Sequence, residues 1–218
     1  MKMGNKRAIL FLYEGDTEKE FYEKIFDKHL PRALKAGFTK SNLQGCGSNI
    51  NNKVSGKIKR FLHEGSKKSF NKIYVIVAHD REGRRDECQS SLNIPLLNRE
   101  YIKKKSRIVS IKEILATQDI ESWLFNDIEG IYIFLRVPVP ERNMDSFSNI
   151  EATNNRILSQ LFSRYQKHYQ KGKRVDNFIN SLDLNKIYNA TSDLQVGVAF
   201  IKDICRVQKI QRKSKRNK

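Results

Sequence analysis

The sequence is poor in cysteine and contains no long apolar run. Its three cysteines, Cys46, Cys88 and Cys205, have neither a paired spacing nor neighbouring histidines, which argues against a disulfide framework and a structural zinc site. The longest apolar runs, around residues 73–78 and 130–135, are far too short to cross a bilayer. Residues 1–7 are basic, but strand-like and charged helical patterns follow, so no signal peptide is predicted. We therefore expect a reducing, cytoplasmic setting and no membrane partner.

Acidic residues are scarce relative to basic ones. The chain has 24 aspartates and glutamates against 42 lysines and arginines, a formal net charge of +18. Such an excess repels itself unless a polyanion neutralises it, and nucleic acid is the usual one. Residues 202–218 hold eight of the basic residues against Asp203 alone, yet the rest of the chain is basic as well. A basic surface without a dedicated ligand is the alternative interpretation.

The pattern of apolar residues predicts an α/β fold. A chain of 218 residues with 39% hydrophobic residues can build one sizeable core, or a core plus a small appendage. Because predicted strands alternate with predicted helices, we expect a parallel sheet with helices on its faces. Strands are predicted over 6–14, 71–80 and 107–114, and more weakly over 38–44. Helices are predicted over 16–34, 56–68 and 119–135, with a further helix that runs into a turn at Pro95 and a loop over 45–56.

The clearest internal break is the segment 137–149, which holds two of the four prolines. Polar, basic helical patterns follow it to the end of the sequence. We therefore expect an α/β domain over residues 1–136 and a basic helical C-terminal region and tail over 137–218.

Two of the predicted strands end on acidic residues, Glu14 and Asp80, and Glu82 follows two positions after the second. The functional crevice of an open parallel sheet lies at the carboxyl ends of its strands, so these acids converge if both strands are central. Carboxylates this close destabilise each other unless they are neutralised, and a hard cation such as Mg²⁺ prefers oxygen ligands. We expect Gly15 to permit a sharp turn at the strand tip. Glu18, one helical turn beyond Glu14, can face the same ion.

These residues carry a resemblance to a known family. The stretch "YEGDTEKEFY", followed about 65 residues later by "IVAHDREG", resembles the TOPRIM domain. It is closest to the OLD-like nuclease branch and to small stand-alone TOPRIM-like proteins of bacterial and phage-defence loci, RloB-like ones included. In that family a Glu-Gly and a later Asp-x-Asp, each at a strand end, hold Mg²⁺ for phosphodiester chemistry. "QDIESWLFND" (118–127) resembles the acid–aromatic segment after the core of those small proteins. The resemblance covers roughly residues 6–135.

The resemblance implies a TOPRIM-like fold and a role for each matched acid. Glu14 is implied as a metal ligand or general base, and Asp80 as the principal metal ligand. Glu82 is implied as a further ligand, although it stands where the family has an aspartate. Glu18 and Glu121 are implied as additional metal ligands. Mg²⁺ or Mn²⁺ would polarise the scissile phosphate and lower the pKa of a bound water, and a carboxylate can take the proton of that water.

Basic residues beside the proposed site are candidates for holding a nucleic acid backbone, where phosphate contacts position rather than specify. They are Lys53, Lys57, Arg81, Arg84 and Arg85. The segment "RYQKHYQKGKR" (164–174) interleaves aromatics with cations, which suits stacking on single strands or RNA, and a solvated helix face is its alternative. Its candidate cations are Lys171, Lys173 and Arg174.

Each acid also has an ordinary interpretation. Helix amides can satisfy Glu14, and Asp80 can cap a helix. Glu18 can be a surface acid of its helix, and Glu121 can belong to an ordinary amphipathic helix. His79 points away from Asp80 in a strand, so we expect it to pack in the interior. The joint occurrence of the acids, in strand–turn–helix context, favours the metal site.

The sequence therefore predicts a Mg²⁺-dependent nuclease that cleaves nucleic acid phosphodiesters, with phage defence implied by the resemblance alone. The alternative is a non-catalytic TOPRIM-fold module that binds nucleic acid or joins a partner ATPase. The presence of both Glu14 and Asp80 favours cleavage. Primase-like nucleotidyl transfer is a weaker third hypothesis, because no template-binding zinc element accompanies the core.

Overall fold

The computed structural model describes residues 6–30, 37–44, 49–64, 69–81, 91–116, 118–170 and 177–216, with side chains described as far as Cys205. The first half alternates β1 (Arg7–Tyr13), α1 (Asp16–His29), β2 (Phe38–Asn42), α2 (Ile50–His63), β3 (Lys72–Asp80), α3 (Ile94–Tyr101) and β4 (Ile108–Ala116). The second half contains α4 (Ile120–Leu124), η5 (Phe125–Asp127), α5 (Ile128–Leu135), the short 3₁₀ turns η6 (Val139–Glu141), η7 (Asp145–Phe147) and η8 (Ile150–Ala152), α6 (Asn155–Arg164), α7 (Phe178–Ser181), α8 (Leu184–Ala190) and α9 (Ser192–Arg216).

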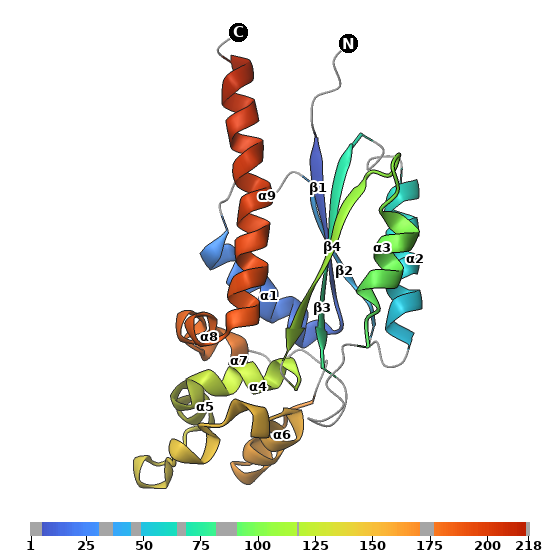
Figure 1. Ribbon diagram of the computed structural model, residues 1–218. Helices are drawn as coiled ribbons and strands as arrows, with labels where there is room; N and C mark the ends of the chain where they lie inside the picture. Colours follow the sequence, from blue (N-terminus) through green and yellow to red (C-terminus); the bar gives the residue numbers. More distant parts are fainter. Residues whose placement is uncertain are drawn as a thin grey trace.

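The strands form one four-stranded parallel sheet in the order β2-β1-β3-β4 (Figure 1). The predicted α/β class, the parallel sheet and the flanking helices are confirmed. Leu12 of β1 pairs with Val77 of β3, so the carboxyl ends of these two central strands lie at the same edge. In Figure 1 the strands point toward α4 and α6 at this edge, which is called the carboxyl edge below.

Both faces of the sheet are covered, which explains why β1 and β3 are continuous apolar runs. Successive side chains of a strand point to opposite faces. Phe11 and Tyr13 of β1 therefore pack with α1 and the C-terminal helices. Leu10 and Leu12 pack on the opposite face, in the core to which α2 and α3 contribute. The fully buried Phe11 ring makes edge contacts with two rings of α1, Tyr22 and Phe26.

The start and the end of α1 both differ from the expectation. Gly15 is the N-cap of α1, with φ −144° and ψ −170°, an extended conformation that any residue adopts. The turn therefore does not depend on the left-handed freedom of glycine. The helix also ends earlier than predicted, because Leu30 leaves the helix with φ −104° and ψ 143°. Leu30 precedes Pro31, and a proline disfavours helical geometry in the residue before it.

Helix α2 begins at Ile50, several residues before the predicted start, and includes part of a segment that we expected to be a loop. Its buried stripe is Ile50, Val54, Ile58 and Phe61, and this spacing of three and four residues supplies an apolar face for the sheet. Burial of that face outweighs the turn preference of the neighbouring asparagines.

The predicted turn at Pro95 is wrong. Pro95 lies in the first turn of α3, where the absence of its backbone N–H costs nothing. Asn93 caps this helix by accepting a hydrogen bond from the backbone N of Leu96 at 2.9 Å. The proline therefore starts the described helix rather than ending one.

The region predicted as one helix over 119–135 is divided into α4, η5 and α5. Asp119 caps α4 by accepting from the N of Ser122 at 3.1 Å, and Asp127 caps α5 by accepting from the N of Gly130 at 3.4 Å. The predicted apolar face is confirmed, because Trp123 and Leu124 are fully buried and their neighbours share the core.

Helices α4 to α8 gather near the carboxyl edge, and α9 runs back along the sheet beside α1 (Figure 1). Phe162, Phe178 and Leu194 from this second half share one continuous core with β1, β3 and β4. The division of the chain into domains at residues 136 and 137 stays a prediction.

Candidate functional site

The carboxyl edge brings Glu14 and Asp80 together. Glu14 follows the last residue of β1, Asp80 is the last residue of β3, and these strands are neighbours in the sheet. The backbone N–H of Asp80 donates to Oε1 of Glu14 at 3.4 Å. Both side chains are buried, with 9% of Glu14 and 3% of Asp80 exposed. Two acids that are 66 positions apart in sequence therefore meet at a single point of the fold.

This point is also where the order of the strands changes direction. The chain leaves β1 for β2 on one side and later reaches β3 on the other, so β1 and β3 flank the switch in strand order. Helix α1 packs on one face and α2 on the other. Connections that leave a sheet in opposite directions open a crevice at the carboxyl ends of the strands between them, where ligands of open α/β sheets bind.

One interpretation of the sequence was that Glu18 is a surface acid of its helix, and the structure contradicts it. Only 2% of the residue is exposed, and it lies on the inner side of α1. Tyr22 lies one helical turn beyond Glu18, and the pKa of its phenol responds to the carboxylates around it. Burial raises the pKa of Tyr22 well above its usual value, and the nearby carboxylates of Glu18, Asp80 and Glu14 raise it further. The charges of three of the predicted site acids, together with that of Asp193, therefore act on one buried hydroxyl.

Asp80 also has a structural partner. Its Oδ1 accepts a hydrogen bond at 3.0 Å from the backbone N of Ile120, the first residue of α4. The sequence alternative was that Asp80 caps the next helix along the chain. The bond seen here instead joins Asp80 to the first backbone N–H of α4, whose own N-cap residue is Asp119. This bond holds the start of α4 against the end of β3.

Glu121 lies in α4 and is completely buried. The hydroxyl of Tyr169 donates to Oε1 of Glu121 at 2.5 Å, and the side chain of Thr17 in α1 hydrogen-bonds to the same tyrosine. Burial, followed by the Glu121 carboxylate, raises the pKa of Tyr169 far above its usual value. The hydroxyl therefore remains a neutral donor at physiological pH.

Tyr169 was missed by sequence reasoning, which offered stacking on bases or a solvated helix face for the segment 164–174. Only 4% of Tyr169 is exposed, and its ring lies 5.3 Å from that of Phe162. The stacking role is therefore wrong for this residue. Tyr165 is half-buried, and its hydroxyl donates to Glu141 at 3.2 Å. A tyrosine in a polar, basic segment gives no sequence signal that it faces inward.

His79 is placed as predicted, on the sheet face opposite to Asp80. Its Nε2 lies 3.0 Å from Oε2 of Glu113, and its Nδ1 lies 3.0 Å from the backbone oxygen of Asp80. The ring is buried within the sheet and links β3 to β4 near their carboxyl ends.

The donor chemistry of these acids fits a hard divalent cation. Within the described ranges, however, no three histidine, cysteine, aspartate or glutamate side chains form a group arranged to hold a metal ion. Glu82 lies outside these ranges. Mg²⁺ is usually bound through one or two carboxylates, with waters and substrate phosphates completing its shell. A buried pair such as Glu14 and Asp80 meets that requirement without a complete protein cage.

The predicted phosphate-binding cations are described only in part. Lys53 and Lys57 lie in the first two turns of α2, and the Lys53 ammonium donates to the backbone oxygen of Gln44 at 3.0 Å. Arg81 directly follows β3, and its backbone N donates to Ala116 at 3.2 Å. These three cations belong to segments at or next to the carboxyl edge. The candidates outside the described residues are Arg84, Arg85, Lys171, Lys173 and Arg174.

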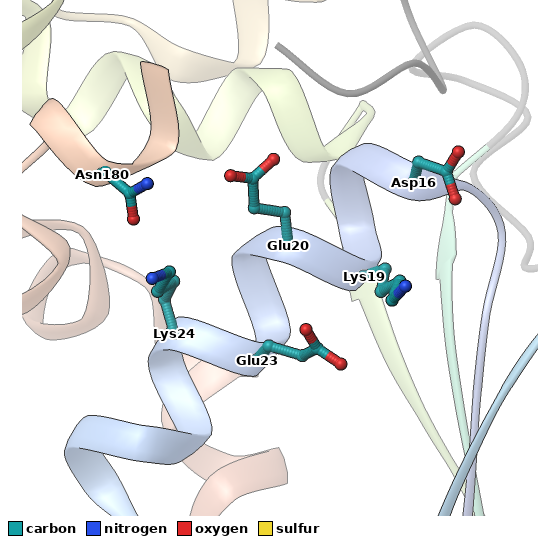
Figure 2. A pocket seen from close by; sticks show the side chains of 6 residues that line it. All are labelled: Asp16, Lys19, Glu20, Glu23, Lys24 and Asn180. Atoms are coloured by element: carbon teal, nitrogen blue, oxygen red, sulfur yellow. The ribbon is translucent and has the colours of Figure 1, made fainter. Parts of the chain in front are cut away.

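A polar cleft of about 340 Å³ lies along the outer side of α1 (Figure 2). Acidic and basic side chains of α1 line it together with Asn180 of α7, and none of the buried acids described above takes part. Glu23 in this lining forms an ion pair with Lys40 at 2.8 Å. Mixed charges of this kind are typical of a solvated helix face, and the cleft is separate from the acidic site. The lining residues are Asp16, Lys19, Glu20, Glu23, Lys24 and Asn180.

The fold and the site together define an α/β protein with a parallel sheet and a buried acidic site at its carboxyl edge. The chain belongs to the family described as Domain of unknown function (DUF4276), whose model matches residues 13–196. The matched region includes Glu14, Asp80, Glu121 and Tyr169.

Two solved structures are similar to this chain. One is the C-terminal region of the Burkholderia pseudomallei OLD protein, with 14% identity, a TM-score of 0.45, and coverage of 90% of this chain and 97% of that chain. The other is the C-terminal region of the Xanthomonas campestris pv. campestris OLD protein, with 15% identity, a TM-score of 0.35, and coverage of 92% and 98%. No curated protein matches the sequence.

Across the part of the chain that the structure describes, none of the helices combines the length and apolar character needed to cross a membrane.

Proposed function

We propose that this protein is a Mg²⁺- or Mn²⁺-dependent nuclease of the TOPRIM class that hydrolyses phosphodiesters of nucleic acid. The observation that carries the proposal is the contact of Glu14 with Asp80 at the switch point of the sheet, both of them buried. The motif resemblance described above supports the same chemistry. A cytoplasmic setting and a role in phage defence belong to this proposal.

Asp80 and Glu14 would hold the cation, with Glu18, Glu121 and Glu82 as further candidate ligands. When bound, the cation supplies charge neutralisation of the scissile phosphate and a more acidic water. The chain's own part is to orient the phosphate and to move a proton. Glu14 is the candidate general base, because it is the more exposed of the two acids.

Lys53, Lys57 and Arg81 would bind the flanking phosphates. Cations on loops and first helical turns beside the site contact the nucleic acid backbone, which fixes its position without selecting its sequence. The net charge of +18 favours association with any polyanion. The proposal therefore includes both RNA and DNA as substrates to be tested.

A second function is favoured by two observations. Asp80 already accepts, through Oδ1, a hydrogen bond from the first backbone N–H of α4, and the described residues contain no group of three side chains that could hold a metal ion. Both facts suit a module that binds nucleic acid, or a partner ATPase, without cleaving. In this alternative the buried acids are structural.

The test is cleavage of RNA, single-stranded DNA and duplex DNA with Mg²⁺ or Mn²⁺, and with EDTA, by the wild type and by Asp80→Asn. Asparagine keeps an acceptor for the N of Ile120 but removes the charge. We expect metal-dependent cleavage that falls in the variant by more than the roughly 10- to 100-fold typical of losing a ligand's hydrogen-bond partner. Asp183→Asn, the same change at the exposed cap of α8, is the matched control.

The possible outcomes separate the two functions. Cleavage that persists in Asp80→Asn comes from a contaminant, and the nuclease proposal then fails. Binding of nucleic acid by the wild type, with no cleavage under any metal condition, supports the binding module instead.

A further inference from the structure

A short chain of hydrogen-bonded side chains joins three distant segments next to the acidic site, where the backbone N of Ile120, the residue before Glu121, donates to Asp80. Thr17 belongs to α1, Glu121 to α4, and Tyr169 to the irregular segment after α6. Tyr169 donates to Glu121 at 2.5 Å, and the Thr17 side chain hydrogen-bonds to Tyr169. Each of the three residues is buried. The tyrosine is the only one of them that comes from the second half of the chain beyond residue 136.

The ring of Tyr169 is fixed by aromatic packing. Its centroid lies 5.3 Å from that of Phe162 in α6 and 6.2 Å from that of Phe178 in α7, and these two rings contact each other at 5.0 Å. All three residues belong to the core that includes β1, β3 and β4. A ring held in this way fixes the position of its hydroxyl oxygen, which lies within hydrogen-bond distance of Glu121.

We propose that Tyr169 is a positioning residue that holds the Glu121 carboxylate in the orientation required by the divalent cation. The inference rests on the proposed function and extends the site to the part of the chain beyond residue 136. Hydrogen-bond partners of metal ligands fix ligand orientation, and their loss typically lowers metal affinity by 10- to 100-fold. The helices after residue 137 are then part of the metal site rather than an appendage to it.

The competing explanation is purely structural. A buried carboxylate needs hydrogen bonds wherever it lies, and Tyr169 supplies one. Loss of a partner for stability alone would lower the free energy of unfolding of the metal-free protein without changing its affinity for metal. The two explanations therefore differ in one measurable quantity, the metal dissociation constant of a folded variant.

The experiment compares Tyr169→Phe with Tyr165→Phe in the full chain. Each change removes one tyrosine hydroxyl that donates to a glutamate, but the acceptor of Tyr165 is the exposed Glu141. Calorimetric titration with Mn²⁺ gives the dissociation constant, and circular dichroism in EDTA confirms the fold. We expect Tyr169→Phe to raise the dissociation constant for Mn²⁺ by about tenfold and Tyr165→Phe to leave it unchanged.

A second variant keeps the test decisive if Tyr169→Phe fails to fold. Thr17→Val replaces only the hydroxyl that hydrogen-bonds to Tyr169 by a methyl group, and valine has nearly the same shape as threonine. We expect a smaller rise in the Mn²⁺ dissociation constant, in the same direction, because hydrogen bonds in a chain polarise one another.

The inference is overturned if the folded Tyr169→Phe protein binds Mn²⁺ as the Tyr165→Phe protein does. If Tyr169→Phe does not fold, unchanged affinity in Thr17→Val has the same meaning. In either case the nuclease proposal stands as long as the wild type cleaves and Asp80→Asn does not. A wild type that binds no Mn²⁺ and cleaves nothing overturns both proposals together.

Discussion

His29 ends α1 with its ring stacked on Tyr188 of α8, at a centroid distance of 3.9 Å and an angle of 20°. Its Nε2 is buried and has no hydrogen-bond partner among the described residues. Burial lowers the pKa of His29 below its usual value, and the charges of Lys202 and Lys28 lower it further. Protonation therefore opposes the packing of α1 against α8.

This arrangement predicts a pH dependence of stability. Because the folded-state pKa of His29 is lowered, the unfolded chain binds more protons on acidification. The contribution of the neutral His29 ring to the free energy of unfolding is then complete above the usual imidazole pKa of about 6.5, and it decreases as the pH falls below that value. We expect His29→Phe, which keeps a stacking ring but cannot be protonated, to lose less stability than the wild type between about pH 7.5 and pH 5.5.

Urea unfolding at several pH values measures this difference. His168→Phe, a change at an exposed imidazole, is the control for the loss of a histidine and should keep the wild-type profile. Equal losses of stability in His29→Phe and the wild type would show that the stacked imidazole does not set the profile.

The residues of the site were predictable from the sequence only where the backbone fixes them. Glu14 and Asp80 each end an apolar run, and the strand ends of a parallel sheet share one edge. The burial of Glu18 and Glu121 was not predictable in this way. Glu18 lies in a charged helix, and the partner of Glu121 is 48 positions away in sequence. Whether a helical acid meets water or protein depends on which distant segment packs against it.

At the scale of elements, helix α9 approaches β4 closely at Gly197. A Cβ atom placed there would lie 2.3 Å from Cδ1 and 2.5 Å from Cγ1 of Ile114. Ile114 is itself 1% exposed, so its side chain has little room to move away. Gly56 in α2 offers the opposite case, since its Cβ position has open space around it.

These two helical glycines predict opposite effects of the same substitution. We expect Gly197→Ala to lower the free energy of unfolding by about 1–3 kcal/mol, the usual cost of overpacking a core. Gly56→Ala should raise it by about 0.5–1 kcal/mol, because alanine loses less backbone entropy in a helix. Urea unfolding of both variants checks the prediction. A neutral Gly197→Ala would show that α9 can move away from β4 at little cost.

Helices and strands were predictable from the sequence where their apolar residues form a continuous run that is buried in the core. The strand ending at Asp80 is a continuous apolar run covered on both faces, and its predicted bounds nearly match the structure. The start of α2 and the place of Pro95 were not predictable from local preference. Asparagine and proline favour turns, but an apolar stripe packed on the sheet, or a first helical turn, accommodates both. Tertiary packing decided these cases.

For the whole molecule, a buried pair of acids is combined with a basic net charge. Glu14 and Asp80 lie at the carboxyl edge, close to the switch point of the sheet, and the chain as a whole carries a net charge of +18. A polyanion is therefore attracted to the protein as a whole, and the carboxyl edge brings it close to two buried carboxylates. This arrangement suits a substrate whose charge is neutralised by lysine and arginine and whose reacting phosphate needs a cation to approach the acids.

The same charge predicts how binding to nucleic acid depends on salt. Each phosphate neutralised by a cation releases condensed counterions, so the logarithm of affinity should fall linearly with the logarithm of salt concentration. Lys57 lies midway along α2, whose first turn is at the carboxyl edge, whereas Lys104 precedes β4 and so lies near the amino ends of the strands. We expect Lys57→Ala to reduce the slope by about one, and Lys104→Ala, with the same change in net charge, to leave it near the wild-type value.

Fluorescence anisotropy of labelled single strands in EDTA measures the slopes without cleavage. Equal reductions in both variants would mean that binding responds to total charge and has no fixed position on the protein. A change confined to Lys57→Ala would instead place the nucleic acid over the edge where Glu14 meets Asp80, which is where the proposed chemistry requires it.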